Sequence, residues 1–179
     1  MPRLAARALR ANRAYMASVL RGLSDAEAPA DLGQLRRTAE IETGNAEAAF
    51  QRLLTEPRKH RGRMAQAFAI VTYLQRLERH LIALAEQVGT VSPPREAVVA
   101  LGELLEDTQE AIATAIETDQ SLSPCPSFDE VLMHLRAALT AADEHGHGEE
   151  VAFLLGRLVN DTASLHSAAT RKAARIGAQ

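Results

Sequence analysis

An unbroken apolar repeat between residues 63 and 88 constrains the fold more than any other feature of the chain. Its apolar side chains recur in alternating steps of four and three residues. This spacing places them on one face of a helix and is typical of a helix that packs lengthwise against another. The repeat consists of Ile70, Leu74, Leu77, Leu81, Leu84 and Val88.

Five other segments show the same helical period, separated by clusters that contain Pro and Gly. We expect helices at about residues 4–23, 31–56 and 63–88, a fourth helix whose inward face runs from Val98 to Ala115, a loop at 119–126, a fifth helix that Ser127 opens, and a sixth at about 149–175. No segment alternates with period two for long enough to predict a strand. The sequence therefore predicts an all-α fold, an antiparallel helical bundle of about six helices, because most connections are short. We expect one soluble domain over residues 1–179, with a basic N-terminal helix at 1–23, a helical bundle at 31–179, and the third and fourth helices as its spine.

Composition narrows the class of protein. Aromatic residues make up 3% of the chain and Trp is absent, so Leu, Ala and Val must fill the core. The net charge of −3 argues against a dedicated nucleic-acid binder, and one cysteine, Cys125, excludes an internal disulfide framework. No apolar window approaches the 18 residues of a membrane span, and residues 1–23 are too charged for a signal peptide.

Catalytic and metal-binding patterns are weak. His145 and His147 flank a glycine, but zinc needs convergent third and fourth ligands, and a carboxylate-bridged di-iron bundle needs Glu-x-x-His pairs that this chain lacks. Neither a nucleophile elbow nor a Gly-rich phosphate loop is present. We therefore predict no enzymatic activity, no catalytic residue, no cofactor and no metal site.

Positive charge dominates the first segment, because five arginines precede the first acid at Asp25. Three of them, Arg3, Arg7 and Arg10, share one helical face. Such a face suits an anionic lipid surface at the cytoplasmic side of a membrane. The alternative is that these arginines pair with acids elsewhere in the bundle, for instance Glu40 or Glu47.

The helix expected at 31–56 has a weak middle, because Gly44 in a helix interior costs about 1 kcal/mol relative to Ala. Gly44 and Ala48 lie one turn apart, where small side chains let another backbone approach, so we predict a close helix–helix contact. The alternative is an ordinary core helix in which Gly44 is merely tolerated. The candidate packing and polar-edge residues are Arg36, Arg37, Glu40, Gly44, Asn45, Glu47, Ala48 and Arg52.

Residues 36–57, "RRTAEIETGNAEAAFQRLLTEP", resemble a helix in the soluble part of the fusaric-acid-resistance-like family of bacterial inner-membrane proteins. The matching elements are the paired arginines 36–37, the segment 45–48 and the segment 51–57. "ALRANRAYMASVL" is similar to the helix that leaves the last membrane span of such proteins, and "YLQRLERHLIALAEQ" resembles the next long helix. The likeness covers residues 5–90 and extends to the remainder only as a helical pattern.

The resemblance implies a function. The chain would be the cytoplasmic domain of an inner-membrane efflux protein for small aromatic or amphipathic acids, with an interaction, dimerisation or gating role. Its expected partners are the membrane-embedded part of the same parent protein, a second copy and the anionic lipid surface, with no nucleic acid. The alternative is a stand-alone soluble protein that senses a ligand or regulates another protein.

Overall fold

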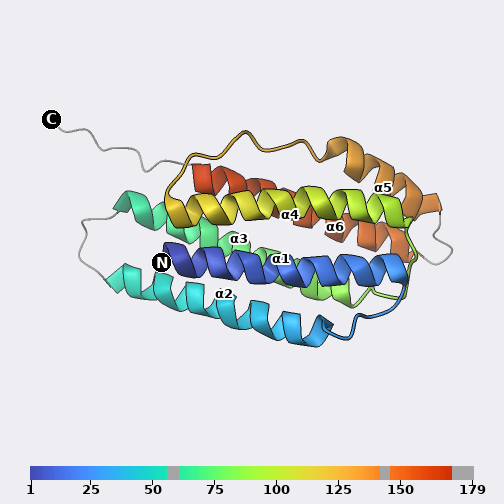
Figure 1. The fold of residues 1–179 in the computed structure, drawn as a ribbon, viewed down its shortest axis with the longest axis horizontal. Helices are drawn as coiled ribbons and strands as arrows, with labels where there is room; N and C mark the ends of the chain where they lie inside the picture. The colour runs from blue at the N-terminus through green and yellow to red at the C-terminus, as the bar shows by residue number, and fades with distance from the viewer. Residues whose placement is uncertain (56–60, 142–145, 171–179) are drawn as a thin grey trace.

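The computed structural model describes residues 1–55, 61–141 and 146–170, with side chains from residue 64 onward in the second range. This part of the chain is all-α: six helices pack antiparallel and no strand is present (Figure 1). The helices are α1 (Pro2–Asp25), α2 (Leu32–Thr55), α3 (Arg61–Ala85), α4 (Arg95–Thr118), α5 (Asp129–Ala141) and α6 (His147–Thr170). The predicted fold class is confirmed, and the predicted end of the last helix beyond residue 170 lies outside the described residues.

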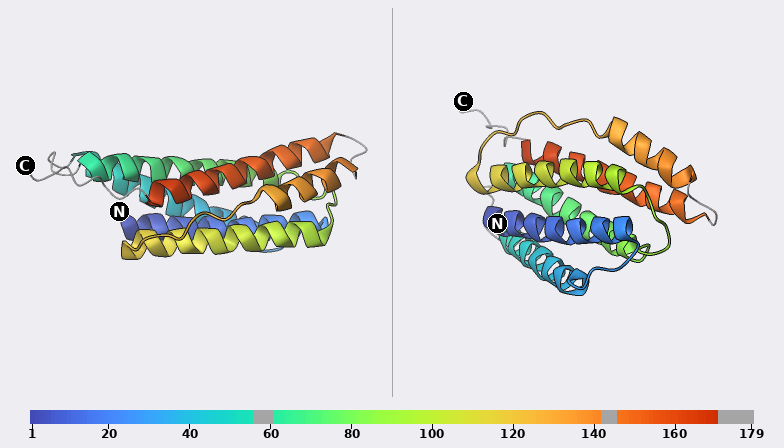
Figure 2. Two further views of the ribbon diagram at one scale, coloured as in Figure 1. Left: turned by 90° about the horizontal axis from the view of Figure 1, so that it is seen from above. Right: turned by 45° about the vertical axis from the view of Figure 1, so that its right-hand side comes forward.

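Four helices form the centre of the bundle. α1, α4, α6 and α3 contact one another in that order around a ring, while α2 packs on α1 and α3, and α5 packs on α4 and α6. Figure 1 and the two views in Figure 2 place α2 and α5 on opposite flanks. Consecutive helices run antiparallel, so α1 is parallel to α3 and α4 is parallel to α6.

The spine of the bundle differs from the prediction. We expected α3 and α4 to form it, but within the described residues these two helices are not neighbours, and α1 contacts α2, α3 and α4. One side of α1 is fully buried, including Leu9, Tyr15 and Met16. The sequence hides this role because the five arginines of α1 occupy the opposite side, and small alanines such as Ala5 and Ala8 supply much of its buried face.

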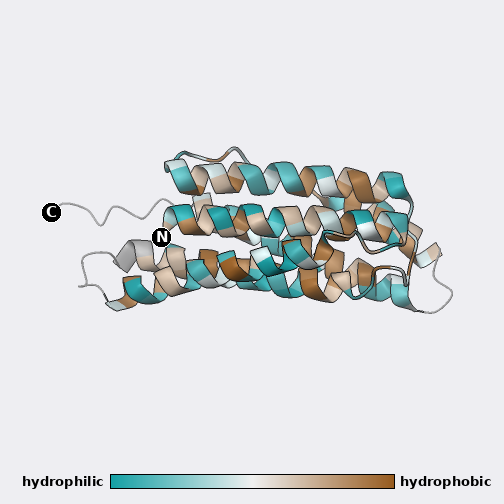
Figure 3. Ribbon diagram, turned by 60° about the horizontal axis from the view of Figure 1, so that its bottom comes forward, coloured by the Kyte–Doolittle hydropathy of each residue, from teal (hydrophilic) through white to brown (hydrophobic). Residues whose placement is uncertain are grey.

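The apolar repeats themselves are confirmed. In α3 the repeat from Ile70 to Leu84 is at most 5% exposed, whereas Val88 lies beyond the helix and is partly buried. The same spacing recurs in α6, where the buried residues include Val151, Leu155, Leu158, Thr162 and Leu165, and in α4, where they include Val98, Leu101, Leu105, Thr108, Ile112 and Ala115. Figure 3 shows hydrophobic and hydrophilic residues alternating along each helix. Leu, Ala and Val side chains on the inner faces of the helices thus form the core of a bundle that has almost no aromatic residues.

Glycine permits a close approach at Gly22, near the end of α1. A Cβ atom there would lie 2.9 Å from Cδ of Pro29 and 3.3 Å from the carbonyl oxygen of Glu27. The chain between α1 and α2 therefore folds directly onto α1 at a position that has no room for a side chain.

Candidate functional site

The predicted contact at Gly44 is wrong within the described part of this chain. A Cβ at Gly44 would meet no atom within 4 Å, and Gly44, Asn45 and Ala48 are all exposed on the outer face of α2. The opposite face carries the contacts, through Ala39, Thr43, Ala46, Ala49 and Phe50. The helical projection placed Gly44 beside the buried stripe, but among the described helices α2 contacts only α1 and α3, which leaves that edge uncovered.

Gly44, on an open face, and Gly22, at a close contact, give a matched pair of predictions. Gly44→Ala is expected to raise the free energy of unfolding by about 0.5–1 kcal/mol, because alanine lowers the entropy cost of an exposed helical position. Gly22→Ala is expected to lower it by about 1–2 kcal/mol, because the new methyl group would overlap the rigid ring of Pro29. Urea denaturation of both variants tests this, and a stabilising Gly22→Ala would contradict the described contact.

The other polar-edge candidates of α2 do not form one site. Arg36 pairs with Glu40 at 2.8 Å on the surface, which raises the pKa of Arg36. Arg37 and Arg52 are exposed, and Glu47 is partly exposed. Sequence reasoning missed Glu42, which pairs with Arg7 across the α1–α2 interface.

The arginines of α1 mostly point into ion pairs with other helices. Nε of Arg10 lies 3.0 Å from Glu110, its Nη1 lies 2.8 Å from Glu117, and Arg13 lies 2.9 Å from Glu110. Glu117 and Glu110 raise the pKa of Arg10 through these hydrogen bonds. The alternative of pairing within the bundle is therefore confirmed for Arg7 and Arg10, although neither Glu40 nor Glu47 is the partner. Arg3 is exposed.

A polar cluster links α1 and α2 and extends to α3. Nδ2 of the buried Asn12 donates to Oγ1 of Thr43 at 3.0 Å, and Thr43 is close enough to the half-buried Glu78 of α3 to affect its pKa. Burial raises the pKa of Glu78 above its ordinary value of 4.5, and Thr43 offsets part of this rise. Burial also raises the pKa of Tyr15, one turn from Asn12. The hydrogen bond between Asn12 and Thr43 fixes the register of α2 against α1, because a shift of α2 along its axis would leave Asn12 without Thr43.

Glu78 should make the stability of the bundle depend on pH. Because its folded-state pKa is raised, its contribution is fully present below pH 4.5 and is lost as the pH rises through the folded-state value. Glu78→Gln should thus stabilise the protein at pH 7 by roughly a few tenths of a kcal/mol, since solvent screens a half-buried group. Below pH 4.5 the gain should vanish. Urea melts across this range test the prediction against exposed Glu103→Gln, for which no such crossover is expected.

A buried carboxylate connects α3 and α6. The side chain of Asp161 is 1% exposed, and its two oxygens lie 2.9 Å from Nη2 of Arg76 and 2.8 Å from Nδ1 of His80. Arg76 also lies over the ring of Tyr73 at 5.5 Å. This cluster carries no signal in the sequence, because Asp161 lies 81 positions from His80 and 85 from Arg76 and stands in an otherwise ordinary amphipathic helix.

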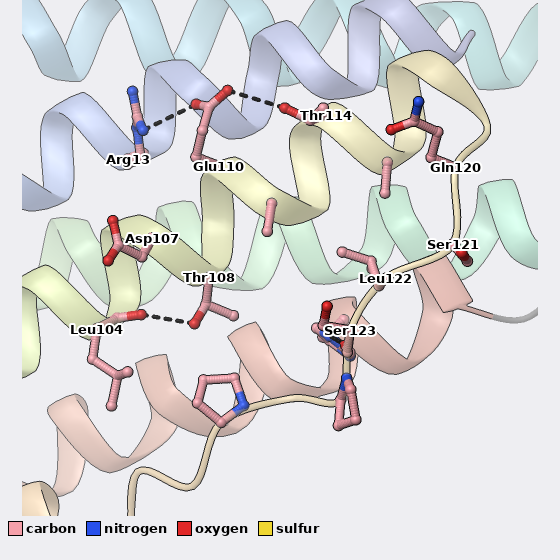
Figure 4. A pocket seen from close by; sticks show the side chains of 15 residues that line it. Arg13, Leu104, Asp107, Thr108, Glu110, Thr114, Gln120, Ser121, Leu122 and Ser123 are labelled. Carbon is pink, nitrogen blue, oxygen red and sulfur yellow. Dashed lines mark hydrogen bonds and ion pairs between the residues drawn. The ribbon is translucent and has the colours of Figure 1, made fainter.

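One pocket, of about 630 Å³, lies between α4 and the extended segment 119–128 (Figure 4). α1 contributes Arg13 and α6 contributes His166 to its lining, which is otherwise formed by α4 and the segment 120–126. Nε2 of His166 lies 2.9 Å from the carbonyl oxygen of Ser123 and ties the segment to the bundle. Cys125, on the same segment, is partly buried, and burial raises the pKa of its thiol.

Metal ligands do not gather in the described residues: no three His, Cys, Asp or Glu side chains lie close enough to hold an ion. His147 begins α6, whereas His145 lies outside the described part of the chain. None of the described helices is long and apolar enough to cross a membrane.

Comparison with protein-family models, with curated proteins and with solved structures finds no match for this chain.

Proposed function

We propose that this chain is a binding domain without catalytic activity, which serves as the cytoplasmic domain of an inner-membrane exporter of small aromatic or amphipathic acids. The resemblance over residues 5–90 motivates the proposal. Its proposed partners are the membrane-embedded part of the same parent protein and a second copy of the domain. Contact with anionic lipid would rest on Arg3, because Arg7 and Arg10 are held by acids of α2 and α4.

The exposed apolar side chains of α2 and α3 carry the proposal. Within the described residues six large hydrophobic side chains are exposed, and three of them are Ile41, Leu54 and Phe68. Ile41 and Leu54 belong to the helix that carries the family resemblance. Phe68 is 59% exposed, and its ring centroid lies 5.9 Å from that of Phe50. Leu54 lies one turn after Phe50 on α2, so we call Leu54 and Phe68 the α2–α3 apolar surface, whereas Ile41 lies more than three turns away. Exposed apolar residues of this kind support contact with another protein.

A growth assay tests the proposed transport role. Deletion of the gene that encodes the chain should make the bacterium hypersensitive to some members of a panel of aromatic acids. Complementation with the gene that carries Phe68→Ser should restore tolerance poorly, because a polar group would be placed in the contact. Met133→Ser is the matched control, since Met133 is 60% exposed but lies on α5 at the opposite flank. Unchanged growth of the deletion strain on every acid would contradict the proposal.

The pocket beneath the segment 119–128 favours a second candidate function, a stand-alone helical protein that senses a small molecule. Its volume falls within the range of about 300–1,000 Å³ that is usual for ligand sites. Hypersensitivity of the deletion strain separates the two functions, because a sensor without a membrane partner would not itself export acids.

A further inference from the structure

The pocket between α4 and the segment 119–128 is lined by apolar side chains and by charged side chains of which more are acidic than basic. Asp107 and Glu110 on α4 are its acids, and Arg13 is its cation. Among the described residues, no Phe, Tyr or Trp side chain lines it. Its apolar side chains come from both walls: Leu104, Ala111, Ala115, Leu122, Pro124 and Pro126.

The cation of the pocket is already engaged. Arg13 lies 2.9 Å from one carboxylate oxygen of Glu110, and the other oxygen lies 3.0 Å from Arg10. A carboxylate ligand would therefore have to displace Glu110 from Arg13. Asp107, in contrast, has no ion-pair partner among the described residues. The free charge that the lining offers to a ligand is thus negative.

The outer wall of the pocket is held in place before any ligand binds. His166 is 7% exposed and ties Ser123 to α6, and Phe128 anchors the far end of the segment in the core at 5% exposure. Pro124 and Pro126 restrict the backbone between these two anchors. A wall fixed in this way reduces the ordering cost of binding.

We propose that this pocket binds a small amphipathic primary ammonium compound. The ammonium group would donate hydrogen bonds to the carboxylate of Asp107, and the apolar body would lie against Ala111 of α4 and Leu122 of the segment. This inference does not rest on the proposed transport of acids. It assigns the pocket a ligand of the opposite charge to the compounds that the family resemblance suggests.

Isothermal titration calorimetry with the full chain tests the assignment through three probes of similar size: 2-phenylethylammonium, 2-phenylethanol and 3-phenylpropionate. The ammonium probe should bind with one-to-one stoichiometry and more tightly than the other two. Asp107→Asn should weaken its binding about tenfold, the loss expected for a hydrogen bond to a charged group. Glu103→Gln is the matched control, because Glu103 is exposed as Asp107 is but lies one turn earlier on α4 and outside the pocket. Binding of the ammonium probe to this variant should be unchanged.

A second variant tests the location without changing charge. Ala111→Phe should fill the pocket and abolish binding of the ammonium probe, while an unchanged far-UV circular dichroism spectrum shows that the bundle remains folded. The proposal is overturned if no ammonium binding is detected. It is equally overturned if 3-phenylpropionate binds as tightly as the ammonium probe, or if Asp107→Asn and Glu103→Gln have equal effects.

Discussion

Arg76→Met is expected to destabilise the bundle by about 3 kcal/mol, because it leaves the buried carboxylate of Asp161 with His80 as its remaining ion-pair partner among the described residues. Removing one partner of a buried ion pair typically costs about 3–5 kcal/mol, and the lower end applies here because His80 stays in place. The methionine retains the packing of the aliphatic stem, so the loss reports on the charge. Urea denaturation measures it.

Replacing Asp161 should lower the free energy of unfolding by less than replacing Arg76 does. Asp161→Asn removes the buried charge, and the two groups that it leaves behind, Arg76 and His80, are partly exposed and can be hydrated. The double variant Arg76→Met/Asp161→Asn should therefore be more stable than Arg76→Met alone. Arg79→Met is the matched control, since Arg79 is exposed on the same helix. If Arg76→Met costs no more than Arg79→Met, then Asp161 does not depend on Arg76.

Leu9→Ala is expected to cost about 2–5 kcal/mol, the usual range for a leucine removed from a core. Leu9 is fully buried on α1, so the shorter alanine side chain would leave a cavity among the surrounding helices. Leu54→Ala is the matched control, because Leu54 is 46% exposed and should change the free energy of unfolding by less than about 0.5 kcal/mol. Thermal and urea unfolding measure both variants.

A small loss for Leu9→Ala would show that α1 is a peripheral arm. In that case the arginines of α1 would be free to act at a membrane, as the charge pattern alone suggests. The buried face of α1, which runs from Ala5 to Leu23, predicts the opposite, a helix that cannot leave the bundle without unfolding it.

The helices and their buried faces could be predicted from the sequence because they depend on local spacing. The repeat from Ile70 to Leu84 is visible as a period of three and four residues, and the same period defines the inner faces of α4 and α6. The order of the helices around the core is not local. α3 and α4 are joined by a short connection, yet α1 separates them, because their apolar faces pack on other helices.

The candidate site depended on contacts between distant residues, and sequence reasoning accordingly failed there. Gly22 and Gly44 look alike in a helical pattern, and only the fold shows that Pro29 covers the first and no described atom approaches the second. Arg10 finds its acids 100 and 107 positions away. The sequence predicts a loop at 119–126 and places Phe128 on the inner face of the helix that follows, but neither feature indicates that this segment forms one wall of a pocket.

Site-specific photo-crosslinking in intact cells tests the central functional claim most directly. A photoreactive amino acid in place of Phe68, on the α2–α3 apolar surface, should capture a membrane-embedded protein segment or a second copy of the domain. The same amino acid in place of Met133 on α5 should not, although Met133 is equally accessible. Crosslinks from position 68 in the membrane fraction are the predicted result. No crosslink from position 68, with the chain found in the soluble fraction, would contradict the account.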